Sequence, residues 1–348
     1  MDVNKNNHYL SEFSLARYLK LMAKKFPQFY ETFWFDRPKT LSVINKMTKM
    51  PTDFEGKEKG GRGDSYMEAQ RDPLVRIVGI NKLLSLAVSS QDLVKLSHTY
   101  KILDVLGGDG TIARAYSLLM KERANHLLIL TGDIAEDMII NALKYGLPAI
   151  RQPAQYLFLK DNSFDAVIIA YGTHHIPESQ RLRVFKEAQR VLKPKGKIII
   201  HDFEKNSPIE LWFHEVVDKY STTGHKYSHF SKAKLRIYLK NSGFKNIKIF
   251  QMYDPFVISD SNKQNSYNRL MDYVLNMYGL EKLKVNRSLL EVRERISHLI
   301  RKYIHYDSFP PDFIKENTYW RKTLSFYQQN GRFVAEMPRI ALVAIGQK

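Results

Sequence analysis

Two aspartates and three glycines have a spacing that suits the binding of a nucleoside. In KILDVLGGDGTIARA a short apolar run ends near Asp104, and Gly107, Gly108 and Gly110 follow, where they let the backbone approach a ligand at the start of the next helix. About two dozen residues later LLILTGDIAEDM ends at Asp133, where a carboxylate can accept hydrogen bonds from ribose hydroxyls. Asp133 could also cap the following helix, but the order of turn and acid favours ribose binding.

Four histidines lie in two further segments that could act on a substrate. His174 and His175 follow the apolar run DAVIIAYG, and His225 and His229 lie in STTGHKYSHFS. A neutral imidazole has a pKa near working pH and can accept a proton, so each is a candidate catalytic residue. His225 and His229 lie four residues apart, and together with Asp202 they also permit a metal site. Because no third ligand is fixed by the sequence, we expect a polar rim and no metal.

A parallel sheet is predicted to position these residues. From Tyr100 onward the short apolar runs KILDVL, LLILTG, DAVIIAYG and GKIIIHDF alternate with helical segments, a pattern typical of a parallel sheet covered on both faces. KNIKIFQM and RIALVAIG add later strands. This α/β arrangement places Tyr171, His174 and His175 at the carboxyl edge of the sheet, where open α/β folds bind their ligands.

Composition excludes several classes of protein. The 348 residues contain no cysteine, which excludes disulfides, iron–sulfur clusters and any enzyme that attacks its substrate with a thiolate. No uncharged apolar stretch reaches the roughly 18 residues of a membrane span, so a soluble, cytoplasmic protein is expected. The net charge is +18, and residues 204–348 carry much of it with 24 basic and 14 acidic residues. Because these charges are spread along the chain, a solvated surface is favoured over a specific nucleic-acid interface.

The chain divides into four expected regions. Residues 1–98 are rich in apolar residues at helical spacing and predict an N-terminal helical region or lid. Residues 99–258 predict the sheet core, and 259–332 are too long for a plain loop and predict a helical insertion that covers the substrate. Residues 333–348 predict the last strand of the core.

Four segments in series give the core a specific resemblance. LDVLGGDGTIA, TGDIAEDMI, KDNSFDAVIIAYGTHHIPES and FKEAQRVLKPKGKIIIHDF together resemble the class I S-adenosylmethionine-dependent methyltransferases. The resemblance covers residues 100–203 and is greatest to the small-molecule branch, which holds ubiquinone and menaquinone C-methyltransferases and many natural-product O-methyltransferases. It implies a Rossmann-like, seven-stranded, mostly parallel sheet, with S-adenosyl-L-methionine as the cofactor.

The resemblance also implies roles for single residues in cofactor binding. Asp104 and the glycine turn would surround the amino-acid end of S-adenosylmethionine, Asp133 would bind its ribose, and Ile134 would pack on its adenine. The sequence departs from the family pattern at Leu106, usually glycine, and at Pro153, usually acidic. Leu106 narrows the methionine end of the expected site. The residues expected at the cofactor besides these are Gln152, Gln155, Ala154 and Tyr171.

The implied reaction is methyl transfer to an oxygen or an activated carbon of a small, aromatic or apolar acceptor. In O-methyltransferases a histidine just after the fourth strand takes the hydroxyl proton, and His174 aligns best with it; His175, His225 and His229 are the other candidates. A small molecule is the expected partner, without specific nucleic acid, and the sequence leaves a homodimer open. Two alternatives remain: an RNA or protein methyltransferase, favoured by the charge, and a methyltransferase fold that acts only as a binding or scaffold protein.

Overall fold

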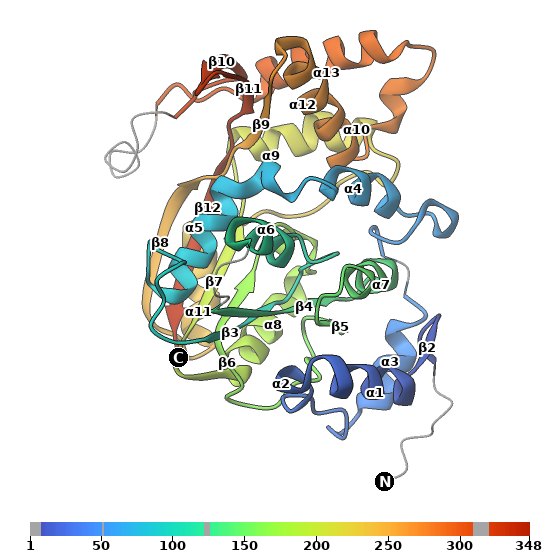
Figure 1. Ribbon diagram of the computed structural model, residues 1–348, viewed down its shortest axis with the longest axis vertical. Helices are drawn as coiled ribbons and strands as arrows, with labels where there is room; N and C mark the ends of the chain where they lie inside the picture. The colour runs from blue at the N-terminus through green and yellow to red at the C-terminus, as the bar shows by residue number, and fades with distance from the viewer. Residues whose placement is uncertain (1–7, 51, 122–125, 309–319) are drawn as a thin grey trace.

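A seven-stranded sheet forms the centre of the computed structural model, which describes residues 8–50, 52–121, 126–308 and 320–348 (Figure 1). Its order is β5-β4-β3-β6-β7-β12-β8. The strands are β3 (Tyr100–Asp104), β4 (Leu127–Asp133), β5 (Ala149–Arg151), β6 (Phe164–Ile169), β7 (Leu192–Asp202), β8 (Lys245–Tyr253) and β12 (Ile340–Gln347). The first five strands in this order, β5, β4, β3, β6 and β7, pair in parallel, and β12 is antiparallel to both β7 and β8. The predicted Rossmann-like, mostly parallel sheet is confirmed.

Helices cover both faces of this sheet because successive strand residues point in opposite directions. Ile102 packs in the apolar layer beneath α5 (Ile77–Val88) and α6 (Thr111–Met120), whereas its neighbour Leu103 packs in the layer on the opposite face. That second layer lies under α8 (Glu178–Val191) and α11 (Lys232–Asn241). Helix α7 (Glu136–Lys144) packs beside β4 and β5.

The N-terminal region packs on the sheet in two parts. Its first elements are β1 (His8–Leu10), β2 (Phe13–Ser14), α1 (Leu15–Lys25), α2 (Pro27–Tyr30) and α3 (Thr40–Met47). Their aromatic residues, among them Tyr18 and Phe33, join the same apolar layer as Phe158 and Phe185. The chain then crosses to the far end of the sheet through η1 (Lys57–Lys59), α4 (Gly63–Gln70) and η2 (Pro73–Arg76), as the blue ribbon of Figure 1 shows.

The insertion between β8 and β12 contains a small sheet as well as helices. Its elements are β9 (Phe256–Asp260), α12 (Lys263–Met277), η5 (Glu281–Lys284), α13 (Leu289–Tyr303), β10 (Ser325–Gln329) and β11 (Arg332–Met337). The antiparallel sheet β10-β11-β9 was not foreseen, and it takes up the beginning of the segment in which we expected only the last core strand.

A second apolar core joins the insertion to the main fold. It includes Trp212 at the end of α9 (Pro208–Trp212) and Phe213 in the π-helical turn η4 (Phe213–Val217), which α10 (Asp218–Tyr220) follows. Arg62, just before α4, donates from Nη1 to the Met277 carbonyl at 2.9 Å, so the N-terminal region and the insertion meet. Within the described ranges, no helix combines the length and apolar character needed to cross a membrane.

Candidate active site

The glycine turn after β3 packs closely against the ends of β3 and β4. A side chain at Gly107 would place its Cβ 2.9 Å from Asp104 Oδ2 and 2.8 Å from Thr131 Cγ2, so only glycine fits between the two strands. Gly108 and Gly110 have φ of +56° and +85°, in the left-handed region that favours glycine. The turn therefore presents bare backbone at the carboxyl edge of β3 and leads into α6.

Asp133 lies at the end of β4, beside this turn. Its Oδ2 accepts a hydrogen bond from the Gly108 amide and its Oδ1 accepts one from the Ala135 amide, each at 2.9 Å. The carboxylate thus holds the glycine turn and the chain leading into α7, and each oxygen retains a lone pair for a further donor. Burial raises the pKa of Asp133 to about 6, although these amide donors oppose the shift.

Asp104 is a buried carboxyl at the inner end of the turn. Its Oδ2 has no hydrogen-bond partner among the described residues. Burial, together with the nearby Asp133 charge, raises the pKa of Asp104 to about 8. At neutral pH the Asp104 side chain is therefore mostly protonated and can donate as well as accept a hydrogen bond.

A cavity of about 260 Å³ opens beside the turn. It extends from Ile134 and Gln152 near β4 and β5 to His175 and Tyr227. Its lining residues are Met50, Thr52, Asp53, Phe54, Leu106, Ile134, Gln152, Ala154, Gln155, Gly172, His175, Ile176, Pro177, Gln180 and Tyr227. Leu106 lies in this wall, so the residue that replaces the usual glycine does take up room in the cavity.

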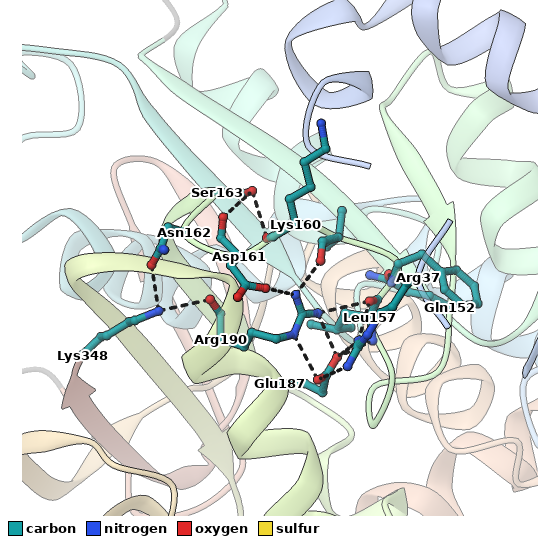
Figure 2. Close-up of polar contacts among 12 residues, drawn as sticks. Arg37, Gln152, Leu157, Lys160, Asp161, Asn162, Ser163, Glu187, Arg190 and Lys348 are labelled. Carbon is teal, nitrogen blue, oxygen red and sulfur yellow. Dashed lines mark hydrogen bonds and ion pairs between the residues drawn. The ribbon is translucent and has the colours of Figure 1, made fainter. Parts of the chain in front are cut away.

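The loop after β5 supplies Gln152, Ala154 and Gln155, the three residues expected near Pro153. Figure 2 shows the polar network that holds this loop. The Glu187 carboxylate on α8 receives hydrogen bonds from Arg37, from Arg190 and from the Leu157 amide. Further on, Phe158 donates from its amide to Gln152 Oε1 at 2.9 Å. The Gln152 Nε2 is buried without a partner among the described residues.

One wall of the cavity comes from the N-terminal loop that contains Asp53 and Phe54, in which the sequence predicted no site residue. Asp53 Oδ2 accepts a hydrogen bond from the Tyr227 hydroxyl at 2.5 Å and lies 3.7 Å from His175 Nδ1. Glu55 is buried, and its carboxylate accepts from the Glu136 amide at 3.0 Å at the start of α7. The charged, glycine-rich residues 55–64, EGKEKGGRGD, are typical of a loop but do not indicate what that loop contacts.

The four predicted histidines converge on the far side of the cavity. The ring centroid of His174 lies 4.5 Å from that of His175, 5.0 Å from that of His225 and 4.7 Å from that of His229. His174 Nδ1 is hydrogen-bonded to Asp202 Oδ1 at 2.9 Å. His175 lines the cavity, whereas the other three rings are buried behind it. The two segments named from the sequence thus form a single cluster.

Burial dominates the electrostatics of the cluster. It lowers the pKa of His174, although Asp202 opposes the shift, and it lowers the pKa of His175 and His225 with help from their neighbouring imidazoles. Burial would raise the pKa of Asp202, but the charge and hydrogen bond of His174 hold it well below its usual range. Burial therefore favours the neutral form of the His174, His175 and His225 imidazoles beside the Asp202 carboxylate.

Tyr171 is placed apart from this group. Its φ of +62° turns the side chain away from the cavity, so that its ring lies 4.4 Å from the His201 ring and its hydroxyl lies 3.4 Å from Asp254 Oδ1. The guanidinium of Arg76 lies over the same ring. Tyr171 therefore belongs to a buried polar network on the α5 side of the sheet.

The fold is that of an α/β protein with a glycine turn and a cavity at the carboxyl edge of its sheet. Residues 103–200 match the methyltransferase domain family. The chain is 38% identical over 112 residues to the ubiquinone/menaquinone biosynthesis C-methyltransferase of Rickettsia prowazekii, across 30% of this chain and 44% of that protein. It is 33% identical over 174 residues to the Rickettsia felis protein of the same name, across 42% and 68%.

The chain belongs to the class I S-adenosylmethionine-dependent methyltransferase family. Among solved structures, one similar chain is phosphoethanolamine N-methyltransferase 2 from Haemonchus contortus in complex with S-adenosyl-L-methionine. The two are 15% identical, with a TM-score of 0.46, over 90% of this chain and 59% of that one.

Proposed function

We propose that the protein transfers the methyl group of S-adenosylmethionine to a small organic acceptor in the 260 Å³ cavity. The observation that carries the proposal is the pairing of Asp133 with Gly108, which joins the acid after β4 to the glycine turn after β3. The family membership of the chain supports the same cofactor.

The residues present fit this cofactor. Two buried polar atoms at the turn and the adjoining loop, Asp104 Oδ2 and Gln152 Nε2, have no partner among the described residues and suit the polar groups of a ligand. Asp104 and the glycine turn would hold the amino-acid end of the cofactor, Asp133 the ribose, and Ile134 with Gln152 the adenine. When bound, the sulfonium supplies an already activated methyl group.

The acceptor is proposed to lie at the His175 end of the cavity. His175 and Tyr227 are held there by Asp53, and the apolar side chains of Phe54 and Leu106 form the nearby wall. This combination suits an aromatic or apolar acceptor with one polar group. The protein chain contributes by orienting the two reactants and excluding water from the cavity. An activated carbon as the methylated atom is supported by the name of the Rickettsia relatives, C-methyltransferases.

Calorimetric titration with S-adenosylmethionine and S-adenosylhomocysteine tests the cofactor. We expect one site for each ligand in the wild-type chain. Asp133→Ala removes the ribose acceptor, and hydrogen bonds to a charged group are each worth about 1.5–3 kcal/mol, so the dissociation constant should rise at least about tenfold. Asp165→Ala is the matched control, because Asp165 Oδ2 also accepts a backbone amide, that of Lys101, but near the start of β3 and β6, at the opposite edge of the sheet.

Two results would refute the cofactor placement. One is unchanged affinity in Asp133→Ala, and the other is equal loss in both aspartate variants. A wild-type chain that binds neither ligand would favour the scaffold alternative instead. Acceptor class is tested with methyl-labelled cofactor and a panel of phenols and hydroquinones, with mass spectrometry to locate the new methyl group on oxygen or carbon.

A further inference from the structure

The histidine cluster holds more unpartnered polar atoms than protein hydrogen bonds can explain. Asp202 Oδ2, His174 Nε2, His225 Nε2 and both ring nitrogens of His229 lack a hydrogen-bond partner among the described residues. The four side chains belong to residues that are only 1–4% exposed. Because buried polar groups are nearly always partnered, so many unpaired atoms in one place point to a missing ligand.

We propose that His174, Asp202 and His229 bind a first-row divalent metal ion. These three residues each offer a ligand atom, and the atoms lie within 4.8 Å of one another. Asp202 Oδ1 lies 2.9 Å from His174 Nδ1 and 3.4 Å from His229 Nδ1. Ligand atoms bonded to one ion at about 2.1 Å lie about 3.0–3.4 Å apart. The carboxylate and the two imidazoles are therefore close enough to share an ion that replaces the His174–Asp202 hydrogen bond.

The ligand types indicate which ions would bind. Two imidazoles and one carboxylate suit zinc, iron(II) or cobalt(II), whereas magnesium and calcium prefer sites made of oxygen alone. The Phe203 amide donates to Asp202 Oδ1 at 2.6 Å and would orient the carboxylate, as outer contacts do at metal sites. The sequence did not fix a third ligand, and the fold supplies it by bringing His174 to Asp202 and His229.

A second trio of histidines shares His174 but is less suited to a cation. His174, His175 and His225 also place ligand atoms within 4.8 Å of one another. This trio contains no carboxylate to offset the charge of a cation, and Arg62 acts on His175 and His225 as well as on the shared His174. We therefore assign the ion to the trio that contains Asp202. With His175 on the cavity wall and its ring 4.5 Å from that of His174, the ion would lie directly behind the proposed acceptor pocket.

Metal binding is tested on the full chain without a histidine tag. The chain is dialysed against a chelator, its metal content is measured by mass spectrometry, and it is titrated with cobalt(II) while visible absorption is recorded. We expect one equivalent to bind with the bands of a nitrogen- and oxygen-ligated ion, and zinc to displace it. Zinc should also raise the unfolding temperature of the apo chain, because an ion that binds only the folded state stabilises it.

Variants locate the site. Asp202→Asn and His229→Ala should weaken cobalt binding by more than the roughly 10–100-fold typical of losing an outer-shell contact. His214→Ala is the control, because His214 lies in the η4 turn beside Phe213 but is exposed. Circular dichroism checks that each variant folds. The readout is metal binding alone, so the result is independent of whether the protein transfers methyl groups.

Three outcomes would overturn the proposal. The first is a wild-type chain that binds no stoichiometric cobalt or zinc, which would leave water as the partner of the unpaired atoms. The second is a folded Asp202→Asn variant that binds cobalt as tightly as the wild type. The third is loss of binding in His175→Ala and His225→Ala but not in His229→Ala, which would assign the ion to the other trio.

Discussion

Single residues in the site differ in how well the sequence predicts where they lie. The placement of Gly107 and Asp133 could be predicted because a strand, a turn and an acid in fixed order leave little choice of geometry. Tyr171 could not, because its side-chain direction depends on a positive φ that the sequence does not signal. Asp53 contacts Tyr227, which lies far along the chain, and no local sequence pattern predicts such a long-range contact.

The buried Asp104 carboxyl makes a prediction about pH and stability. Its pKa is about 8 in the folded chain and about 3.9 when unfolded. The folded state therefore holds this proton more tightly, so the stability it contributes is present at low pH and is lost as pH rises from about 4 to about 8. Urea unfolding of Asp104→Asn without cofactor should show a smaller decline over this range than the wild type. An identical decline would contradict the shifted pKa.

Asp133 predicts how cofactor affinity depends on pH. Its pKa is about 6, and the charged carboxylate is the stronger acceptor for ribose hydroxyls. Affinity for S-adenosylhomocysteine, measured by calorimetry, should therefore rise between about pH 5 and pH 7. The Asp133→Asn variant should show a weaker rise. If the two chains respond alike to pH, another group controls binding.

At the scale of elements, loops rather than helices complete the site. The sheet and its covering helices follow from apolar periodicity, and six strands were found where the runs KILDVL to RIALVAIG predicted them. The small sheet β10-β11-β9 was missed because its strands are short and only partly apolar. The loop after β5 was named as a binding segment, but the Glu187 network that holds it depends on Arg37, about 150 residues away.

Glu187 offers a test of that loop. Although burial raises the pKa of Glu187, its hydrogen bonds to Arg37 and Arg190 lower it overall. Glu187→Gln leaves the partly buried Arg37 guanidinium without its anion, whereas Arg190 keeps Asp161 at 2.6 Å. Breaking a buried pair costs about 3–5 kcal/mol. We expect a destabilisation towards the lower end, since both arginines keep some contact with solvent. Affinity for S-adenosylhomocysteine should also fall.

A second variant distinguishes an effect on the loop from a general loss of stability. Glu178 begins the same helix, α8, and forms an exposed pair with Lys234 of α11. Because exposed pairs contribute little to stability, Glu178→Gln should have only a small effect. Chemical unfolding and calorimetry on both variants give the comparison. Equal effects of the two substitutions on cofactor affinity would show that the Glu187 network does not hold the loop in its binding conformation.

The molecule as a whole is strongly basic, whereas its proposed site is not. The net charge of +18 favours association with polyanions, but the proposed cavity is lined mainly by uncharged residues. Binding to a labelled polyuridine RNA, measured by fluorescence anisotropy, should therefore be weak. Its affinity should fall steeply as the salt concentration rises from about 50 to about 200 mM, because binding releases counterions. Salt-resistant binding to one RNA sequence, or methyl incorporation into RNA, would contradict this expectation.

The contacts of the N-terminal loop have a consequence for the pace of turnover. Asp53 accepts a hydrogen bond from Tyr227 at the cavity, and Glu55 holds the start of α7. With the cofactor bound as proposed, we expect this wall to part before spent cofactor leaves. If parting is slower than methyl transfer, the first turnover is fast and later ones wait on release, a pattern found in many enzymes with closing loops. Rapid-mixing experiments would then show a burst of methylated product equal to the enzyme concentration, and Tyr227→Phe, which frees the wall, would quicken the steady phase that follows.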